Sequence, residues 1–389
     1  MVFLSETDKC TGCMACFVGC PEQAITISTD AMGNCYPNIQ QELCINCGKC
    51  QKICPELNPI SGRESKRAYA VWSLDPECRK RSASGGAASE FYEEALKQGY
   101  WICGAEYTSE GSVIHSITRE PEAIGRYRQS KYVFSEMIEV YRQIKSKLEA
   151  GEKVLVISLP CKVAGILGYL GKRYDNLLTA DIVCHGTPPK KLLREHVTNI
   201  APEAKQYSIQ FREDNEYLFN LRTEGKLVYS KIGRTDMYLA AFLEGLSYRS
   251  ACYNCNWAQP KRISDLTVCD FWGLGTEIPF DHPYTGSVSA VLINSEKGQT
   301  FFDVCRKNLF VEERPVFEAV KGNTQLNVPT QKHPKQELFK ALYEKIGFDE
   351  AVKEILGKEI RLERKLVFRR KLYRVLRKMA GLFIKRYRG

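Results

Sequence analysis

Eight cysteines in two matching runs carry the clearest chemistry in this sequence. The runs are Cys10, Cys13, Cys16, Cys20-Pro21 and Cys44, Cys47, Cys50, Cys54-Pro55. This spacing is typical of bacterial two-cluster ferredoxins. Three thiolates of one short loop bind three irons of a [4Fe-4S] cube, and the fourth cysteine binds the other cube because it cannot fold back onto its own.

The spacing therefore predicts two ligand sets that exchange their fourth members. The first cluster is expected to take Cys10, Cys13, Cys16 and Cys54, and the second Cys44, Cys47, Cys50 and Cys20. A zinc site uses four ligands in two pairs, which these runs do not match. The sequence shows no secretory signal, so disulfides are not expected instead. We expect residues 1–60 to form a 2[4Fe-4S] ferredoxin-type domain that moves electrons.

The residues between the runs predict the elements that position them. Glu22–Ile27 and Tyr36–Ile39 are short and β-prone, and a turn through Gly33 joins them. Each half thus consists of a cluster loop and a strand, which indicates a pseudo-twofold repeat. Cys35 belongs to neither run, and we expect it to be a small half-buried residue.

Length and composition limit the remaining possibilities. A chain of 389 residues is too long for a ferredoxin alone and suggests two or three domains. A hydrophobic content of 44% is ordinary for a globular protein. No apolar run reaches the roughly 18 residues that span a membrane. Seventeen cysteines without an export signal favour a reducing cytoplasm, where they are metal ligands or free thiols.

The net charge of +10 is a property of the C-terminal tail. Residues 361–389 contain 12 Lys and Arg against the single acid Glu363, a net charge of +11, so residues 1–360 carry 10 − 11 = −1. A nearly neutral main body argues against a nucleic-acid-binding face. We expect no nucleic-acid partner.

A linker at residues 58–66 and a β-type stretch at 68–72 introduce the next domain. The segment Ser84-Gly85-Gly86 then precedes an amphipathic helix. Small residues at a helix N-terminus let a phosphate approach free N–H groups and the positive end of the helix dipole. An ordinary helix cap explains the same residues equally well.

The middle of the chain alternates between strands and helices. Residues 154–158 and 177–183 are predicted strands, and helices are predicted from 162 and through 192–197. This alternation favours a parallel sheet. Cys161 and Cys184 each follow the end of a strand, at the edge where such sheets bind ligands.

Cys252 and Cys255 complete a second group of four candidate ligands with Cys161 and Cys184. Four thiolates suffice for a third cubane, but they also suit a zinc site. A redox-active Cys252/Cys255 pair and plain buried thiols fit the same residues. We expect His185 to be a neighbour of the bound group rather than a ligand.

Several of these segments together resemble the family of coenzyme F-420 hydrogenase/dehydrogenase beta subunits. They are Leu159–Gly165, Asp181–Gly186, Cys252-x2-Cys255, Asp270–Gly273, Ser84–Gly86 and Gln129–Val133. The resemblance runs from about residue 66 to 340. It implies an N-terminal family domain at 66–150 that holds the flavin loop and a C-terminal one at 151–340 that holds the third Fe–S site.

The resemblance implies FAD beside a [4Fe-4S] cluster. Ser84, Gly85, Gly86 and Lys131 would then lie at the flavin, and Cys161, Cys184, Cys252 and Cys255 would hold the inner cluster. Cys269 stands before Asp270 where the family usually has glycine, so this fifth thiol either competes for ligation or simply packs in the core. Relatives pass electrons between a two-electron carrier and one-electron centres.

The tail at 358–389 predicts a basic amphipathic helix. Its apolar residues at helical spacing are Leu362, Leu366, Phe368, Leu372, Tyr373, Val375, Leu376, Met379, Ala380, Leu382, Phe383 and Tyr387. Such a helix can lie on an anionic membrane, dock an acidic partner or cover its own domain.

The expected fold is α+β or α/β: the ferredoxin domain, a mixed α/β flavin and iron–sulfur domain with parallel strands, and the tail helix. The expected function is an iron–sulfur flavoprotein oxidoreductase that passes electrons between [4Fe-4S] clusters and a two-electron substrate. Coenzyme F-420, a nicotinamide or a small organic acceptor would be that substrate, and ferredoxin or another redox protein the partner. The alternative is an electron-transfer subunit that feeds a separate enzyme. We expect a cytoplasmic protein that can also lie peripherally at the inner face of the membrane.

Overall fold

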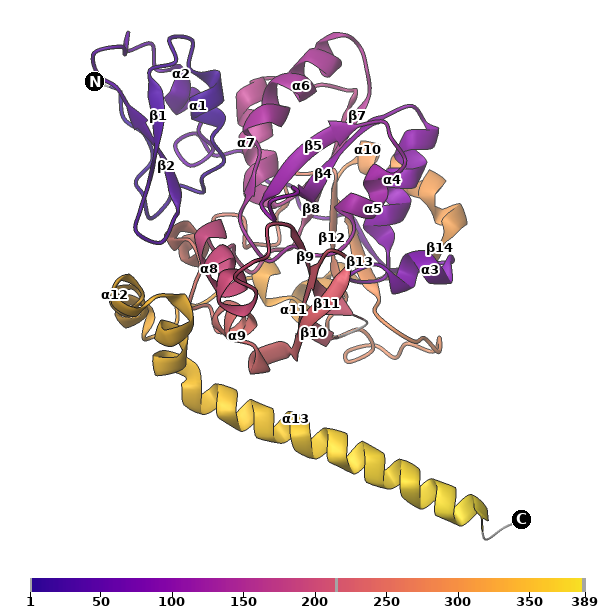
Figure 1. Cartoon of the computed structure of the whole chain (residues 1–389). Helices are drawn as coiled ribbons and strands as arrows, with labels where there is room; N and C mark the ends of the chain where they lie inside the picture. Colours follow the sequence, from indigo (N-terminus) through magenta and orange to yellow (C-terminus); the bar gives the residue numbers. More distant parts are fainter. Residues whose placement is uncertain (1, 214–215, 387–389) are drawn as a thin grey trace.

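The computed structural model describes residues 2–213 and 216–386, and for residue 371 and residues 374–386 it describes the backbone alone. A small N-terminal unit packs beside a large α/β body, and a long C-terminal helix leaves the body (Figure 1). The body contains a nine-stranded sheet and a separate three-stranded sheet.

The N-terminal unit has the predicted repeat. Its strands β1 (Ile25–Thr29) and β2 (Cys35–Ile39) pair antiparallel, and its helices are α1 (Ala15–Gly19) and α2 (Lys49–Ile53). Each helix follows a residue with positive φ, Met14 at 64° and Gly48 at 69°. These left-handed residues turn each cysteine loop into its helix.

The nine-stranded sheet is mixed, in the order β14-β3-β13-β12-β8-β7-β4-β5-β6. Its strands are β3 (Arg67–Ser73), β4 (Trp101–Tyr107), β5 (Val113–Thr118), β6 (Ser135–Glu136), β7 (Val154–Ser158), β8 (Leu177–Ile182), β12 (Leu266–Asp270), β13 (Ser289–Ile293) and β14 (Leu309–Arg314). The neighbours β12, β8, β7 and β4 run parallel, which confirms the predicted parallel strands. The segments 66–150 and 151–340 both contribute strands to this one sheet.

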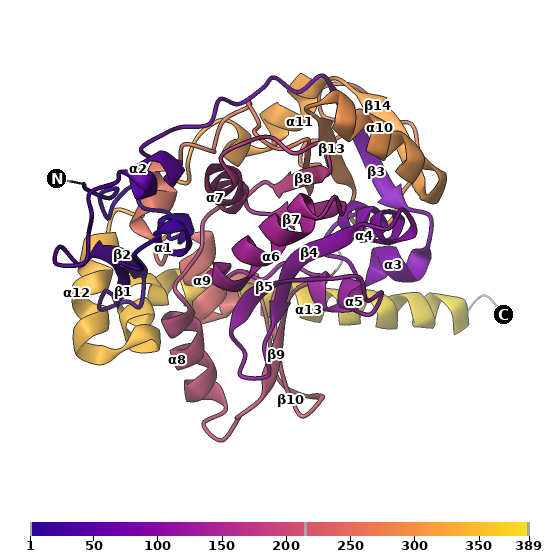
Figure 2. The ribbon, with the colours of Figure 1, turned by 90° about the horizontal axis from the view of Figure 1, so that it is seen from above.

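Helices cover both faces of the large sheet. They are α3 (Pro76–Lys80), α4 (Ala87–Lys97), α5 (Ala123–Tyr127), α6 (Ile138–Glu149), α7 (Pro160–Leu170), α10 (Glu296–Cys305) and α11 (Val316–Gly322). One core packs α4, α5 and α10 on one face, and α6 and α7 form another core on the opposite face. The ferredoxin unit lies against α6 and α7, as Figure 2 shows from above.

The smaller sheet, β11-β10-β9, forms the remaining core with the other helices. Its elements are β9 (Tyr207–Glu213), β10 (Glu216–Thr223), β11 (Lys226–Ile232), α8 (Lys190–Ile200), α9 (Met237–Leu243), α12 (Gln336–Ile346) and α13 (Phe348–Arg386). His196 of α8 lies between Asp236 at 3.1 Å and Asp349 at 2.6 Å, which ties the first turn of α13 to this core.

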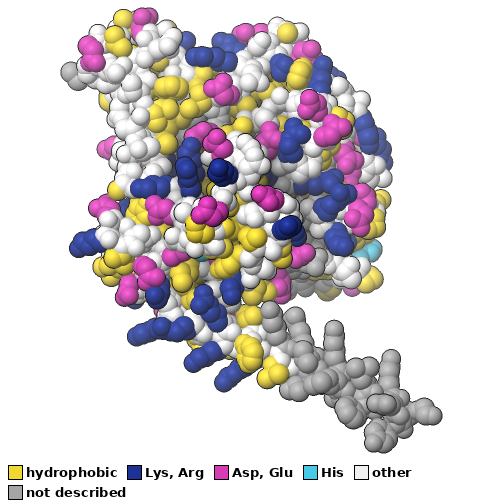
Figure 3. Space-filling model, in the orientation of Figure 1, with side chains coloured by type: hydrophobic (Ala, Val, Ile, Leu, Met, Phe, Trp, Pro, Cys, Tyr) yellow, Lys and Arg dark blue, Asp and Glu magenta, His cyan; other side chains and the backbone are white. Residues whose placement is uncertain are grey.

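The long helix α13 leaves the body beyond its first three turns. Among the side chains that the structure describes, Ile360 is the last one of α13 within the hydrophobic core. Figure 3 shows Lys and Arg side chains on the part of the chain that projects from the body. Leu362, Phe368 and Tyr373 are exposed. The side chains of Val375, Leu376, Met379, Ala380, Leu382 and Phe383, and all of Tyr387, lie outside the described residues, so the amphipathic pattern stays a prediction. In the described part of the chain, no helix is apolar over a length that would cross a bilayer.

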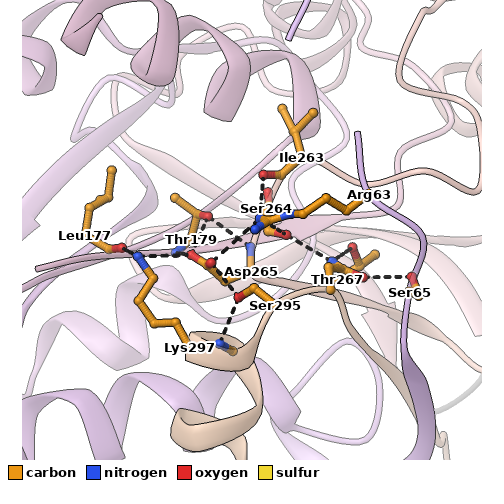
Figure 4. Close-up of polar contacts among 12 residues, drawn as sticks. Arg63, Ser65, Leu177, Thr179, Ile263, Ser264, Asp265, Thr267, Ser295 and Lys297 are labelled. Atoms are coloured by element: carbon orange, nitrogen blue, oxygen red, sulfur yellow. Dashed lines mark hydrogen bonds and ion pairs between the residues drawn. The ribbon is translucent and has the colours of Figure 1, made fainter. Parts of the chain in front are cut away.

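The segment predicted as a linker is bonded to the edge of the body (Figure 4). The backbones of Arg63 and Arg262 exchange two hydrogen bonds of 2.8 Å. The Arg63 guanidinium also donates to the carbonyl of Ile263 and lies 3.8 Å from the Asp265 carboxylate. These contacts fix the point at which the ferredoxin unit joins the sheet.

Candidate functional site

The cysteines of the ferredoxin unit line two small cavities. Cys10, Cys13, Cys16 and Cys54 line the first-cluster cavity, and Cys20, Cys44, Cys47 and Cys50 line the second-cluster cavity. Each cavity thus takes three cysteines from one run and the last cysteine from the other. The donor sets suit a [4Fe-4S] cube each. The assignment of the eight as ligands stays a prediction.

Three distant segments bring four further cysteines together in a third cavity, here called the thiol cavity. Cys161 lies in the first turn of α7, Cys184 follows β8, and Cys252 and Cys255 belong to a short 3-10 turn (Ser250–Asn254) and the residue after it. Pro160 at the start of α7 suits the first helical position, where no N–H is needed. In the described ranges, no three His, Cys, Asp or Glu side chains converge as they would around a single ion.

Burial sets the chemistry of these four thiols. Each is partly exposed and lines the thiol cavity. Burial raises the pKa of Cys161 well above its ordinary value and raises the pKa of Cys255 to about 11. A reactive redox cysteine needs a lowered pKa, so these shifts argue against a free Cys252/Cys255 redox pair. Bound metal would supply the charge that deprotonates them.

A larger cavity opens at the carboxyl ends of β7 and β8. Its lining includes the small and polar residues Ser82, Ser84, Gly86, Ser89, Arg128 and Gln129 and the aromatic residues Tyr92, Tyr127, Tyr132, Tyr217, Phe242 and Trp272. Ligands of open parallel sheets bind at this edge. A lining that combines aromatic and polar side chains suits a molecule with a flat ring and an anionic group.

Three of the four residues expected at a flavin line the large cavity: Ser84, Gly86 and Lys131. Gly85 does not. It packs against strands β3 and β13, where a Cβ would lie 2.5 Å from the Val71 carbonyl oxygen and 2.7 Å from the Ser289 nitrogen. Gly85 therefore permits a close approach of backbones behind the wall of the large cavity, and its role as a flavin contact stays a prediction.

The N-terminus of α4 fits a phosphate group. Gly86 is its N-cap, has a φ of 94°, and provides no side chain to accept from the first turn. The first N–H groups of the helix are therefore available to an anion, as at other phosphate-binding helix ends. The buried Gln129 side-chain oxygen has no hydrogen-bond partner among the described residues, so it is also available to a ligand. The residues present fit a cofactor that carries a phosphate group, and FAD stays a prediction.

Lys131 braces the cavity wall. Its Nζ donates to the carbonyls of Arg128 at 2.9 Å and Gln129 at 3.3 Å, across a turn in which Gln129 has a φ of 71°. Burial lowers the pKa of Lys131 to about 7. Lys131 therefore stabilises the 128–131 turn. Because its pKa is lowered, its ammonium group loses a proton more readily than an ordinary lysine does.

The structure adds a pair that the sequence did not single out. His115 on β5 and Ser158 at the end of β7 both line the large cavity, and the His115 Nε2 lies 2.7 Å from the Ser158 hydroxyl oxygen. Burial lowers the pKa of His115 to about 3, so the ring is neutral. No sequence signal links these two residues, because they are 43 positions apart.

Cys269 and His185 take different positions. Cys269 on β12 is buried and lines the large cavity, and it is not part of the lining of the thiol cavity. His185 lines both cavities, and burial lowers its pKa. His185 thus lies between the two candidate cofactor sites, which agrees with its expected position as a neighbour.

The large cavity, the thiol cavity and the first-cluster cavity are neighbours in a row. The large cavity and the thiol cavity share Cys184, His185, Gly186 and Thr187. The thiol cavity also includes Thr11 from the first cluster loop. Helix α7 touches the first cluster loop at Gly165, where a Cβ would lie 2.9 Å from the Cβ of Cys13. These shared residues and contacts place the large cavity, the thiol cavity and the first cluster loop side by side.

Comparisons with known proteins agree with this architecture. Residues 151–318 match the family model of the C-terminal part of the coenzyme F420 hydrogenase/dehydrogenase beta subunit, and residues 68–142 match the model of its N-terminal part. Residues 9–57 match the 4Fe-4S dicluster domain. The chain is 22% identical over 330 residues to the F subunit of the F(420)H(2) dehydrogenase of Methanosarcina mazei, covering 80% of this chain and 86% of the relative.

Among solved structures, the chain is similar to a chain of the F420-reducing [NiFe] hydrogenase complex from Methanosarcina barkeri. The identity is 18%, the TM-score is 0.44, and the match covers 77% of this chain and 94% of that one. The two family models together span most of the α/β body, so the resemblance drawn from the motifs is confirmed. This chain belongs to the family of coenzyme F420 hydrogenase/dehydrogenase beta subunits and carries an N-terminal 4Fe-4S dicluster domain.

Proposed function

We propose that this chain is an electron-transfer subunit that links a two-electron carrier at the large cavity to a partner enzyme at the ferredoxin unit. The row of neighbouring cavities carries this proposal, because the large cavity adjoins the four thiols of the thiol cavity, which in turn adjoins the first-cluster cavity. The name of the Methanosarcina mazei relative, one subunit of a dehydrogenase, supports such a role.

In this proposal Cys161, Cys184, Cys252 and Cys255 hold a third [4Fe-4S] cluster. Their number and their convergence in one cavity support a cluster. The protein's part is to hold the thiolates at one edge of the sheet and to exclude water from them. The alternative is a zinc ion bound by the same four thiols. Metal analysis distinguishes the two.

FAD is the second proposed cofactor, held by Ser84, Gly86 and the N-terminus of α4. A bound flavin would supply the exchange between two-electron and one-electron carriers. The open helix end and the aromatic part of the large cavity support it. The chain's own residues bind the anionic part at α4, and the Lys131 brace keeps the 128–131 turn beside it.

The other end of the row supports a partner protein. Cys47 is the one exposed cysteine of the 17. Exposed apolar side chains surround it in sequence, with Leu43 at 51% and Ile45 at 62% exposure. Val2 donates from its backbone to Asn46, which brings the exposed Phe3 to the same loop. Apolar residues beside an exposed redox centre suit a transient protein contact.

A second candidate is an enzyme with its own small two-electron substrate, a coenzyme F-420-like deazaflavin, a nicotinamide or a small organic acceptor. The large cavity favours it, because a part of its lining is aromatic and not needed to hold an anionic tail. Anaerobic assays distinguish the candidates. Turnover of an added F-420 or nicotinamide by the isolated chain with dithionite-reduced ferredoxin supports the second. Turnover that needs a co-purified protein supports the first.

Metal analysis tests the clusters. Anaerobically purified protein should contain about twelve irons per chain with three cubanes and about eight with the ferredoxin unit alone. Cys161→Ser or Cys252→Ser should lose about four irons. Cys305→Ser is the matched control, because Cys305 is also buried but lies in the core between α4 and α10. One zinc with about eight irons in the wild type would exclude the third cluster.

Cofactor release tests FAD. The released cofactor should run as FAD on chromatography, and Gly86→Asp should lower its occupancy by adding a negative charge beside the bound phosphate. Gly86→Ala is the matched control, since both substitutions meet the same φ of 94° and only Asp adds charge. Protein that stays free of flavin after anaerobic reconstitution with FAD rules the flavin proposal out.

We also propose that the tail helix lies on an anionic membrane surface. Twelve basic residues in 361–389 and the exposed Leu362, Phe368 and Tyr373 support this location. The protein would then be peripheral to the membrane.

A further inference from the structure

Two buried cations close the inner side of the first cluster loop. Lys162 from the first turn of α7 and Arg249 from the residue before the Ser250–Asn254 turn are each 2% exposed. They lie 87 positions apart in sequence and reach the same loop, Cys10 to Cys13. Both residues lie outside residues 1–60, so the motif of eight cysteines does not include them.

Arg249 makes the closer contacts. Its Nε donates to the Cys10 carbonyl oxygen at 2.6 Å, its Nη2 donates to the Cys35 carbonyl oxygen at 2.7 Å, and the same Nη2 lies 4.0 Å from the Cys10 sulfur. Lys162 donates from Nζ to the Gly12 carbonyl oxygen at 3.4 Å. Both side chains thus contact the loop that would bind the first cluster, and Lys162, which follows Cys161, also lines the thiol cavity.

Gly12 makes this approach possible. Its φ is 67°, and a Cβ there would lie 2.8 Å from Nη1 of Arg249 and 2.9 Å from its Cζ. A larger residue would therefore displace the guanidinium. The loop is built so that a positive charge lies directly against it.

No carboxylate pairs with either cation within residues 2–213 and 216–386. The nearest acid that acts on Lys162, Glu136, has its own ion pair with Lys190 at 2.6 Å. Aromatic rings flank the two side chains instead. The ring centroid of Phe134 lies 3.9 Å from the Lys162 Nζ, and the ring centroid of Tyr36 lies 4.3 Å from the Arg249 Cζ. Burial lowers the pKa of Lys162, so its positive charge needs a nearby anion to be stable. A cubane with four thiolates is such an anion, and its negative charge grows by one when it is reduced.

The second cluster loop has no equivalent among the described residues. Asn46 stands where the first loop has Gly12, and Asn46 and Cys47 are exposed. The nearest Lys residues in sequence, Lys49 and Lys52 of α2, are also exposed. Water and salt screen exposed charges, so they act on a cluster much more weakly than buried ones.

We propose that Lys162 and Arg249 raise the reduction potential of the first ferredoxin cluster above that of the second. The inference rests on the proposed function only in that both ferredoxin clusters are present. Reduction here is the gain of one electron from a reductant, with no bond formed or broken. An electron that reaches the ferredoxin unit from α7 then stays on the buried cluster, and the exposed cluster is reduced from it when a partner draws the electron away.

The test is a dithionite titration with redox mediators, followed by electron paramagnetic resonance of the anaerobic full-length holoprotein. Lys162→Met and Arg249→Met should each shift the electron partition between the two ferredoxin clusters at least tenfold toward the second, since a buried unit charge is removed. Tenfold corresponds to about 59 mV for one electron. Cys47→Ser, which alters only the second cluster, assigns the two signals.

Three control variants make the result decisive. Lys162→Arg and Arg249→Lys retain the charge and should keep the wild-type order of potentials, and Lys52→Met removes an exposed charge and should leave it unchanged. If a Met variant loses iron, the same partition is measured with Lys162→Gln or Arg249→Gln. Unchanged potentials in iron-replete neutral variants would overturn the inference. Wild-type protein without two ferredoxin-type signals would instead overturn the proposed function.

Discussion

Residues 10–20 and residues 44–54 repeat the same cysteine spacing, and both pass through a left-handed residue into a short helix. Their surroundings differ. The first loop lies under α7 and two buried cations, and the second faces solvent with Cys47 exposed. Two copies of one motif can therefore have different redox roles, because the protein around each copy sets its charge and its access to water.

The largest expected effect is the order in which the clusters are lost. On stepwise anaerobic treatment with ferricyanide and a chelator, the second cluster should decay first and remove about four irons, because its cysteines are the more exposed. Iron analysis and electron paramagnetic resonance at each step measure this. Simultaneous loss of both ferredoxin-type signals would break the comparison.

The next prediction concerns the tail helix, which would be a second contact surface besides the exposed loop at residues 44–54. The full chain should pellet with phosphatidylserine vesicles at low salt and release as salt rises, because surface charges are screened within ~10 Å at 0.1 M. A chain ending at Lys365 should remain in the supernatant and keep its clusters, since it retains the buried Ile360 and the Arg364 hydrogen bond to Thr235.

Equal behaviour of the two chains in this assay would contradict membrane contact. The tail helix would then either pack against its own body or bind a partner protein. A shortened chain that also loses its flavin would favour packing against the body.

An exchange of the two corresponding loop residues sharpens the comparison further. Gly12→Asn should destabilise the protein by about 2 kcal/mol, because its Cβ meets the Arg249 guanidinium. Asn46→Gly removes only an exposed residue and one hydrogen bond from Val2, so it should cost less than about 1 kcal/mol. Denaturant unfolding of the anaerobic holoprotein measures both. Equal costs would mean that the two loops are not differently packed.

The smallest effect tests the contact between α7 and the ferredoxin unit. Gly165→Ala adds a methyl 2.5 Å from the Tyr141 hydroxyl and 2.9 Å from the Cys13 Cβ, and it should destabilise by about 1 kcal/mol. Gly125→Ala is the control, because this helical glycine has open space around it and the change should be neutral or slightly stabilising. A stable Gly165→Ala variant would show that the two units are loosely docked.

Several features were readable from the residues alone. The spacing of eight cysteines predicted the ferredoxin unit, because ligation of a cube restricts local geometry within a few residues. The apolar runs at 154–158 and 177–183 predicted the parallel pair β7 and β8, since a buried parallel strand is apolar on both faces. The motifs of the α/β body predicted the family.

Other features were decided only by the tertiary structure. The gathering of Cys161, Cys184 and Cys252 in one cavity needs three segments to meet, and spacing along the chain does not report that. Spacing along the chain also does not report that Gly85 packs against strands β3 and β13, or that His115 and Ser158 form a hydrogen-bonded pair. The cations show the reason most clearly. Lys162 and Arg249 are ordinary basic residues in the sequence, and only folding brings their charges, without carboxylate partners among the described residues, onto the first of two identically spaced cysteine loops.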